Sequence, residues 1–114
     1  MVNMNEFIEH LKTRFALETC HHSYQSRWSI ENPSIGHCAI AAIAIQEKFG
    51  GDVFKTKVGN STHYYNVIDN QIIDSTSEQF GKIIDYSKGI ICNVKKMLLV
   101  KDTKLRYEIL KSKI

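Results

Sequence analysis

Cys38 is the residue of this sequence that is best placed to act as a nucleophile. It follows Gly36 and His37 and begins an apolar run, CAIAAIAI, that has the composition of a buried helix. The first turn of a helix carries free backbone N–H groups and the positive end of the helix dipole, and both favour a thiolate. The N–H of Cys38 would also point to where an oxyanion develops in acyl transfer. The sequence therefore predicts a reactive thiol at the start of a helix.

Two further residues would complete a site for acyl transfer. His63 and Asp74 lie on successive strand patterns joined by Asp69-Asn70, a dipeptide typical of a two-residue hairpin turn. With that turn Tyr65 pairs with Asp74, so His63 and Tyr65 share a face and Asp74 becomes a diagonal neighbour of His63. A carboxylate there would orient the imidazole while its other nitrogen faces the thiol. A register shift of one residue would destroy this arrangement.

These residue types also have ordinary structural interpretations. Unpaired cysteines in apolar runs are mostly inert core residues. His63 also fits a half-exposed strand position, and Asp74 fits a cap of the turn STSEQF that follows it. The residues alone therefore leave the choice between a catalytic triad and a plain core open.

A metal site is a further alternative. Cys20, His21 and His22 are consecutive, and His37 directly precedes Cys38. Adjacent histidines rarely reach one ion with good geometry, and the sequence has neither C-x₂-C nor H-x₃-H spacing. We therefore expect neither a metal nor an organic cofactor, and a Cys/His metal-binding protein is the least favoured function.

Three helices are predicted around these residues. Residues 4–17 place apolar side chains at three- and four-residue intervals, which predicts an amphipathic N-terminal helix. The apolar helix from Cys38 to Phe49 ends at Gly50-Gly51, and its four alanines allow close packing, so it should be the central, buried helix. Asp102 is expected to cap a C-terminal helix. The buried stripe of that helix should be Leu105, Ile109 and Leu110.

The strands are predicted between the last two helices. DVFKTKV, THYYNVI and QIID alternate as strands do and are separated by Gly59-Asn60 and Asp69-Asn70. A long polar loop with Trp28 and Pro33 precedes Cys38, and loops of this length in small domains are usually functional. GIICNV and KMLLV stay unassigned. The order of elements predicts an α+β domain with a central helix packed on an antiparallel β-meander and a helix at each end.

The composition is that of a single cytoplasmic domain spanning residues 1–114. Apolar residues make up 43% and charged residues 24%, which suits a chain that buries a core, and an odd number of cysteines (three) favours free thiols. Cys20 and Cys92 are interpreted as ordinary core or loop thiols. Charge interrupts the apolar pattern at the N-terminus, so no signal peptide is predicted. No stretch approaches the roughly 18 apolar residues of a membrane span.

Positive charge is concentrated near the C-terminus. From Lys82 onward nine Lys and Arg side chains stand against three acidic ones, which gives +6 and leaves −3 for the preceding residues. Such asymmetry can indicate nucleic acid or an acidic partner. A solvated helix face explains it more often, and no RNA-binding motif accompanies it, so we do not expect nucleic-acid binding.

Five segments between Trp28 and Leu110 form a recognisable series: WSIENPSIGHCA, FGG, HYYN and IDSTSEQF, followed by T-x-x-R-Y-x-x-L. This series resembles the YunG-like family of bacterial proteins, whose motifs are W…ENPxxGQC, an FGG helix end, an HYWN strand and D-x-T-x-x-Q-F. The order of Cys on a helix, His on a strand and Asp on the next strand is similar to that of papain-like and transglutaminase-like thiol hydrolases. The resemblance thus implies a small papain-like domain.

This resemblance implies a role for each matching residue. Cys38 would be the nucleophile, His63 the general base and then acid, and Asp74 the orienting residue. Asn32, whose backbone is restricted by Pro33, is the candidate for the side-chain amide that papain-like enzymes place upstream of the nucleophile to support the oxyanion.

Three further residues are candidates for the cleft. Trp28 belongs to the first motif, and Tyr65 stands where the family has tryptophan, which changes the wall beside His63. His37 stands where glutamine is usual. His37 either contributes to the site or marks a member with altered or lost chemistry.

Two functions follow from the resemblance. The first is a thiol-dependent hydrolase or acyltransferase that acts on an amide, isopeptide or thioester bond of a protein, peptide or acyl substrate. The second is a catalytically silent papain-like module that keeps the cleft and binds a partner. Reactivity of Cys38 distinguishes the two.

Overall fold

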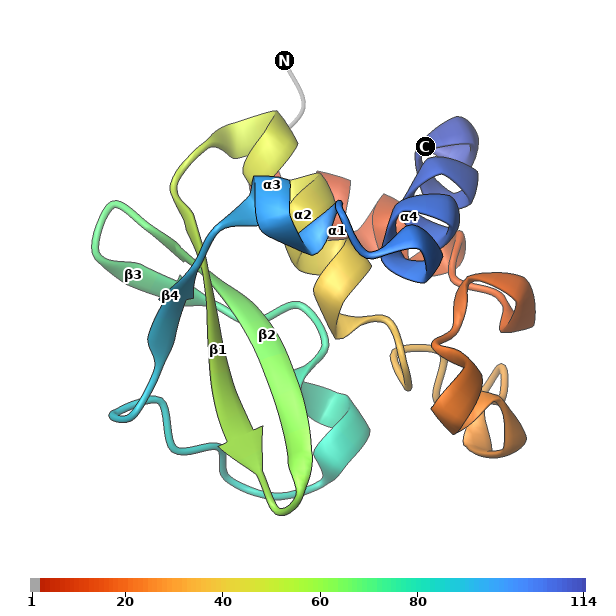
Figure 1. Ribbon diagram of the computed structural model, residues 1–114, viewed down its shortest axis with the longest axis horizontal. Coiled ribbons are helices and arrows are strands. Elements are labelled where there is room, and N and C mark those ends of the chain that lie inside the picture. The colour runs from red at the N-terminus through yellow and green to blue at the C-terminus, as the bar shows by residue number, and fades with distance from the viewer. Residues whose placement is uncertain (1–2) are drawn as a thin grey trace.

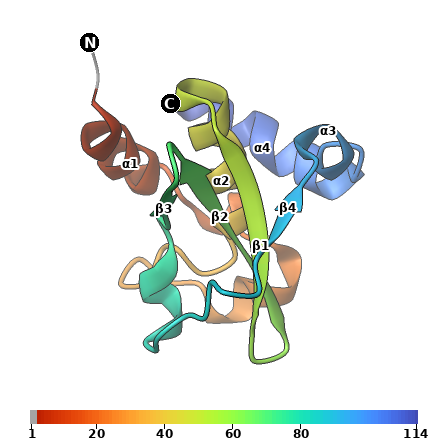
Figure 2. The same ribbon diagram turned by 90° about the vertical axis from the view of Figure 1, so that its left-hand side faces the viewer.

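Helix α2, Cys38–Phe49, lies at the centre of the fold. The computed structural model describes residues 3–114, so residues 1–2 of the predicted domain lie outside the described range. Helix α2 buries six consecutive residues from Ile40 to Ile45, and Gly50, with a φ of 80°, caps its end. It packs against one face of the β-sheet, with α1 and α4 beside it (Figures 1 and 2). The predicted bounds and central position of this helix are confirmed.

The sheet is antiparallel throughout and has the strand order β3-β2-β1-β4. The strands are β1 Asp52–Val58, β2 Ser61–Ile68, β3 Gln71–Ile73 and β4 Ile90–Cys92. The side-chain amide of Asn66 on β2 donates to the carbonyl oxygen of Ala42 at 2.9 Å and ties the sheet to α2. Since a buried amide needs such a partner, this bond fixes the position of the helix on the sheet.

The predicted β2–β3 hairpin has the expected register. Val67 pairs with Ile72 and Ile68 with Gln71, while Asp69 and Asn70 have φ values of 52° and 63°. Positive φ at both central residues is the conformation that a two-residue hairpin turn requires. The register prediction on which the proximity of His63 and Asp74 depends is therefore confirmed.

Strand β4 lies in the segment GIICNV, for which the sequence predicts no element. It pairs with β1, and Ile90 and Ile91 are both more than half exposed. A three-residue strand with exposed apolar side chains shows no burial alternation, so only its pairing with β1 identifies it. The predicted three-stranded meander is thus extended to four strands.

Helix α1, Met4–Thr13, is four residues shorter than predicted. The side chain of Asn3 caps its start by accepting from the N–H of Glu6 at 2.8 Å. Phe15 lies beyond the helix and is nevertheless buried, because its ring stacks on His37 with 4.3 Å between centroids. Phe15 continues the apolar spacing of α1 in the sequence, but it is buried against the loop before Cys38 and not as part of the helix. The prediction therefore extended the helix too far.

Helix α4, Lys101–Lys113, contradicts two details of the prediction. Its N-cap is Val100, and Asp102 lies inside the helix, where its carboxylate accepts from Nε of Arg106 at 2.9 Å. The buried residues are Arg106, Tyr107 and Leu110, whereas Leu105 is 58% exposed. The buried stripe is displaced because Arg106 has partners inside the fold.

The remaining elements are short. They are α3, Val94–Met97, and three 3-10 helices, Leu17–Thr19, His22–Arg27 and Ser77–Phe80. The chain therefore forms the predicted α+β fold. Within residues 3–114, no helix combines the length and apolar character needed to cross a membrane.

Candidate active site

His63 and Asp74 form a buried hydrogen-bonded pair. His63 lies on β2 with its side chain fully buried, and its Nε2–H donates to Oδ2 of Asp74 at 2.7 Å. Asp74 directly follows β3, and its side chain is only 6% exposed. A buried carboxylate in this position fixes the orientation of the imidazole ring and favours its protonated form.

Asp74 has two further hydrogen-bond donors. The hydroxyl of Tyr86 donates to Oδ2 at 2.7 Å, and the backbone N–H of Thr76 donates to Oδ1 at 3.3 Å. Asp74 therefore combines both roles considered for it, since it braces His63 and also closes the turn after β3. Burial and the bond to Asp74 raise the pKa of Tyr86. Sequence reasoning did not find Tyr86, because it lies in an irregular segment with no periodic signal.

Cys38 is the first residue of α2 and is partly exposed. The backbone N–H groups in the first turn of a helix have no partner within the helix. The sulfur lies 4.0 Å from the carbonyl oxygen of Thr62, the residue before His63. The start of α2 thus lies directly against the part of β2 that carries the imidazole.

The electrostatics of His63 are dominated by three influences. Burial lowers its pKa, but the hydrogen bond to Asp74 and the adjacent Cys38 sulfur outweigh burial and raise the pKa to about 9. The second ring nitrogen, Nδ1, is buried and makes no hydrogen bond to a described residue. An imidazolium with one free N–H beside a sulfur atom is the arrangement that stabilises a thiolate.

Aromatic rings hold the imidazole in place. The Phe80 ring meets His63 edge-on at 4.8 Å, and the nearly parallel Tyr65 ring lies 6.4 Å away. Tyr65 is buried and packs against Tyr86 at 4.8 Å. Its hydroxyl occupies the space that a Cβ on Gly89 would need. Tyr65 is therefore the predicted wall beside His63, and Phe80 comes from the STSEQF segment.

Two cavities open next to Cys38. The first, here called the Phe80 cavity, has a volume of about 270 Å³ and is also lined by Arg27 and Lys82. The second, here called the Arg106 cavity, has a volume of about 440 Å³. Both cavities share Tyr24, Gly36, Cys38, Ser61 and Thr62. Cys38 thus lies between the two cavities and lines both.

The loop before Cys38 is anchored at Gly36. Gly36 has a φ of 75°, and a Cβ added there would lie 2.4 Å from the Cys20 sulfur. Its carbonyl accepts from the N–H of His21 at 3.0 Å, and the Cys20 thiol donates to the carbonyl of Ile35 at 3.3 Å. Only glycine fits this position, so close contact with Cys20 sets how the chain enters α2.

His37 lies in the core. Its Nδ1–H donates to the carbonyl of Ile35 at 2.9 Å, and its Nε2 accepts from the hydroxyl of Thr19 at 2.7 Å. Burial lowers the pKa of His37 to about 4, so the ring is neutral at pH 7. His37 lines neither cavity next to Cys38.

Trp28 and Asn32 also lie apart from the two cavities. Trp28 donates from its indole nitrogen to the carbonyl of Pro33 at 3.0 Å and lines a separate cavity with Lys12 and Phe15. The backbone N–H of Asn32 donates to the carbonyl of Ser29, which closes a turn. Contacts of His63 bring it together with Cys38, Asp74 and Tyr65, and of these four only Cys38 lines the two cavities. His37, Trp28 and Asn32 lie in the supporting loop.

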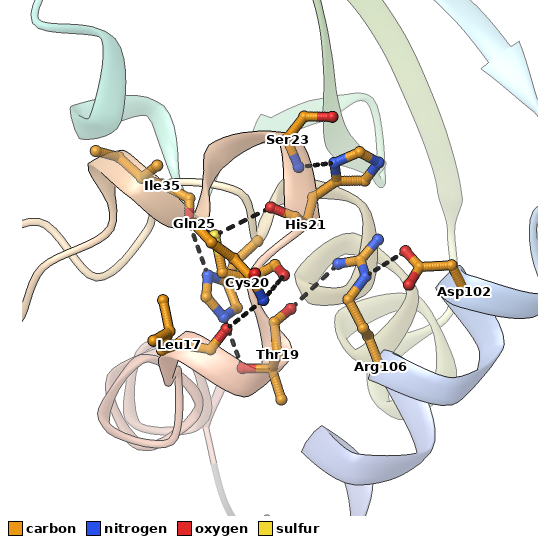
Figure 3. A network of polar contacts seen from close by, with 10 residues as sticks. Leu17, Thr19, Cys20, His21, Ser23, Gln25, Ile35, Asp102 and Arg106 are labelled. Atoms are coloured by element: carbon orange, nitrogen blue, oxygen red, sulfur yellow. Dashed lines mark hydrogen bonds and ion pairs between the residues drawn. The ribbon is translucent and has the colours of Figure 1, made fainter.

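The described residues contain one candidate cluster for a metal ion, and it differs from the Cys/His set that the sequence offers as the least favoured alternative. His21, His22 and Asp102 place potential ligand atoms within 4.8 Å of one another, without Cys20. Nδ1 of His21 accepts from the N–H of Ser23, so the proton of the neutral ring lies on the other nitrogen, Nε2. The Asp102 carboxylate already accepts a hydrogen bond from Arg106 (Figure 3). A guanidinium and a protonated ring nitrogen both oppose cation binding.

The fold and the site together define an α+β protein with a helix-start cysteine beside a His–Asp pair. The chain belongs to the YunG family, because the family model described as YunG protein matches residues 3–114. The protein named "Uncharacterized protein YunG" from Bacillus subtilis (strain 168) is 44% identical over 79 residues, which cover 69% of this chain and 68% of that protein. No solved structure matches the chain. The predicted resemblance to YunG is confirmed.

Proposed function

We propose that this protein is a thiol hydrolase or acyltransferase that uses Cys38, His63 and Asp74. The observation that carries the proposal is the position of the His63 ring, which donates to Asp74 at 2.7 Å and lies beside the Cys38 sulfur. These two neighbours raise the pKa of His63 to about 9. An imidazolium at neutral pH supplies both a counter-charge for a thiolate and a proton for a leaving group.

The reaction would begin with attack of the Cys38 thiolate on the carbonyl carbon of an amide, isopeptide or thioester. The carbonyl oxygen becomes an oxyanion, which the backbone N–H groups at the start of α2 would stabilise. His63 would then give its proton to the departing amine or thiolate as the bond to the carbonyl carbon breaks. The products of this half-reaction are the free leaving group and a thioester on Cys38.

The second half-reaction releases the acyl group. Neutral His63 would take a proton from water or from an acceptor amine as that nucleophile attacks the thioester. Collapse of the second oxyanion expels the Cys38 thiolate and restores the starting ion pair. Asp74 would keep the ring oriented through both steps, and Tyr86 would keep Asp74 in position. Asn32 would support the loop, because its backbone N–H closes the turn with Ser29.

We further propose that the fold is a small papain-like domain. In support, the nucleophile begins the central helix, the histidine lies on the neighbouring strand β2, and the acid follows β3. The four-stranded antiparallel sheet packs on that helix, as a papain-like domain requires.

Alkylation by iodoacetamide at pH 6 tests the proposed function. Cys38 should react at least tenfold faster than glutathione, because only a thiolate is nucleophilic. Burial raises the pKa of both Cys20 and Cys92, so these two thiols serve as internal references when the modified peptides are measured by mass spectrometry. His63→Gln should reduce the rate to that of glutathione. A wild-type Cys38 no faster than glutathione would leave the silent binding module as the better interpretation.

A further inference from the structure

Positive charge surrounds the opening at Cys38. Arg27 and Lys82 line the Phe80 cavity, and Arg106 lines the Arg106 cavity. Neither lining includes an aspartate or a glutamate. Three cationic side chains thus line the two cavities, and no carboxylate belongs to either lining, which gives the opening a positive potential that concentrates anions.

Arg106 is the most informative of the three. It is only 4% exposed, its Nη1 donates to the carbonyl of Thr19 at 3.1 Å, and its Nε donates to Asp102 at 2.9 Å. Nη2 makes no hydrogen bond to a described residue (Figure 3). A buried guanidinium normally uses its donors. Nη2 and the second N–H of Nη1 therefore remain available, and this planar pair of N–H groups can donate to a ligand in the Arg106 cavity.

The charge of Arg106 is only partly compensated. The side chain of its partner Asp102 is 47% exposed, so water screens the ion pair on that side. The positive field of Arg106 still extends to its surroundings. After burial, Arg106 is the largest influence that lowers the pKa of His21, and it outweighs the opposing influence of Asp102. The Arg106 cavity therefore keeps a net attraction for an anion.

The Phe80 cavity adds two exposed cations. The Arg27 guanidinium lies 4.9 Å from the centroid of the Tyr24 ring, and this stacking restrains it at the cavity wall. Lys82 follows the 3-10 helix that ends at Phe80, and its ammonium lies over Gly59 in the β1–β2 turn. Both side chains can be changed without altering a buried contact.

We propose that the site at Cys38 selects substrates that carry a carboxylate near the reacting carbonyl. The planar fork of Arg106 fits a carboxylate, and Arg27 and Lys82 extend the attraction across the opening. The identity of the ligand as a substrate rests on the proposed function, whereas the attraction of an anion to Cys38 does not.

Competition between two alkylating reagents tests the proposal. Iodoacetate carries a carboxylate, iodoacetamide is its neutral counterpart, and both transfer a two-carbon group to the sulfur with release of iodide. The quantity measured is the ratio of the iodoacetate to the iodoacetamide rate at Cys38, divided by the same ratio for glutathione. We expect this normalised ratio to be about 10 or more in the wild type at low salt, and to fall as salt screens the charges.

The variants isolate the contribution of the cations. Arg27→Gln combined with Lys82→Gln should lower the normalised ratio by about threefold or more. The matched control is Lys104→Gln, which removes an exposed charge from α4 outside both cavities and should leave the ratio unchanged. Arg106→Lys keeps the charge but removes the fork, and should lower the ratio as well. Unchanged melting temperatures show that each variant is folded. The charge of His63 also attracts iodoacetate, but all variants keep His63, so it does not contribute to the differences in the ratio between them.

The outcomes separate this inference from the proposed function. A normalised ratio near 1 in the wild type, or an equal ratio in the double variant and the control, would overturn the carboxylate proposal. If Arg106→Lys fails to fold, the double variant alone decides. A slow absolute rate with iodoacetamide combined with a high normalised ratio would reject the proposed catalysis and keep the anion site.

Discussion

His63 is held between influences of opposite sign. Burial disfavours the charged ring, while Asp74 and the Cys38 sulfur favour it strongly enough to raise the pKa to about 9. The charge on this ring therefore depends on the Asp74 carboxylate and not on the position of His63 in β2 alone.

Asp74→Asn tests this dependence at the residue scale. Without the carboxylate, burial prevails and the pKa of His63 should fall from about 9 to 6.5 or below. Titration of the imidazole by NMR measures the change directly. Tyr86→Phe is the matched control, because it removes one donor to Asp74 and keeps the carboxylate, so its pKa change should be much smaller. Equal pKa values in wild type and Asp74→Asn would show that Asp74 does not set the charge.

The two buried histidines also limit stability on opposite sides of neutrality. His63 has a raised pKa, so its contribution is fully present below pH 6.5 and is lost as the pH rises through about 9. His37 has a pKa lowered to about 4 by burial, so its contribution is present above pH 6.5 and is lost as the pH falls towards 4.

Urea unfolding between pH 4.5 and 9.5 should therefore give a maximum of stability near pH 6.5 to 7. His37→Gln removes the titratable ring and should reduce the loss of stability on the acid side by about 1–3 kcal/mol. The alkaline side should keep its slope in that variant, because His63 is unchanged. An unaltered acid side would mean that another group governs acid unfolding.

At the scale of elements, Gly36 determines how α2 begins. Gly36→Ala places a methyl group 2.4 Å from the Cys20 sulfur at a φ of 75°, and we expect it to destabilise the protein by about 2–4 kcal/mol from strain and overpacking. Gly81→Ala is the matched control, since its φ is 62° but a Cβ there meets nothing within 4 Å. Its cost should be only about 1 kcal/mol. Both values come from urea unfolding, and similar costs would exclude the Cys20 contact as the cause.

Elements with a local signal could be predicted from the sequence, and those fixed by distant contacts could not. Helix α2 and the Asp69-Asn70 hairpin follow from apolar periodicity, glycine and a two-residue turn, and the hairpin register follows from that turn. Strand β4 forms only by pairing with β1. The buried face of α4 depends on the bond from Arg106 to Thr19, 87 residues away along the chain. Tyr86 was missed for the same reason.

At the scale of the whole molecule, Glu78 connects three distant parts of the chain. Its carboxylate pairs with Lys12 of α1 at 2.7 Å and accepts from Ser34 in the loop before Cys38. Burial raises the pKa of Glu78, but the bonds to Lys12 and Ser34 outweigh it and lower the pKa overall. These contacts join α1, the loop and the segment after β3 around the site.

Glu78→Gln should weaken this connection with a modest loss of stability. The ion pair is partly exposed, so we expect a cost of about 1 kcal/mol, with faster amide hydrogen exchange in the loop at residues 29–37. Glu108→Gln, an exposed change on α4, should alter neither quantity. Exchange that accelerates equally in both variants would argue against a connecting role.

The three sulfur atoms differ in how far solvent reaches them. Cys20 is completely enclosed against Gly36, whereas Cys38 and Cys92 are partly exposed. Oxidants in an ageing, reductant-free sample would therefore reach Cys38 and Cys92, while the Cys20 sulfur that shapes the loop stays reduced. Such a preparation would retain its circular dichroism and melting behaviour, yet be inert toward electrophiles. Measurements of folding would therefore not reveal whether the Cys38 sulfur is still a thiol.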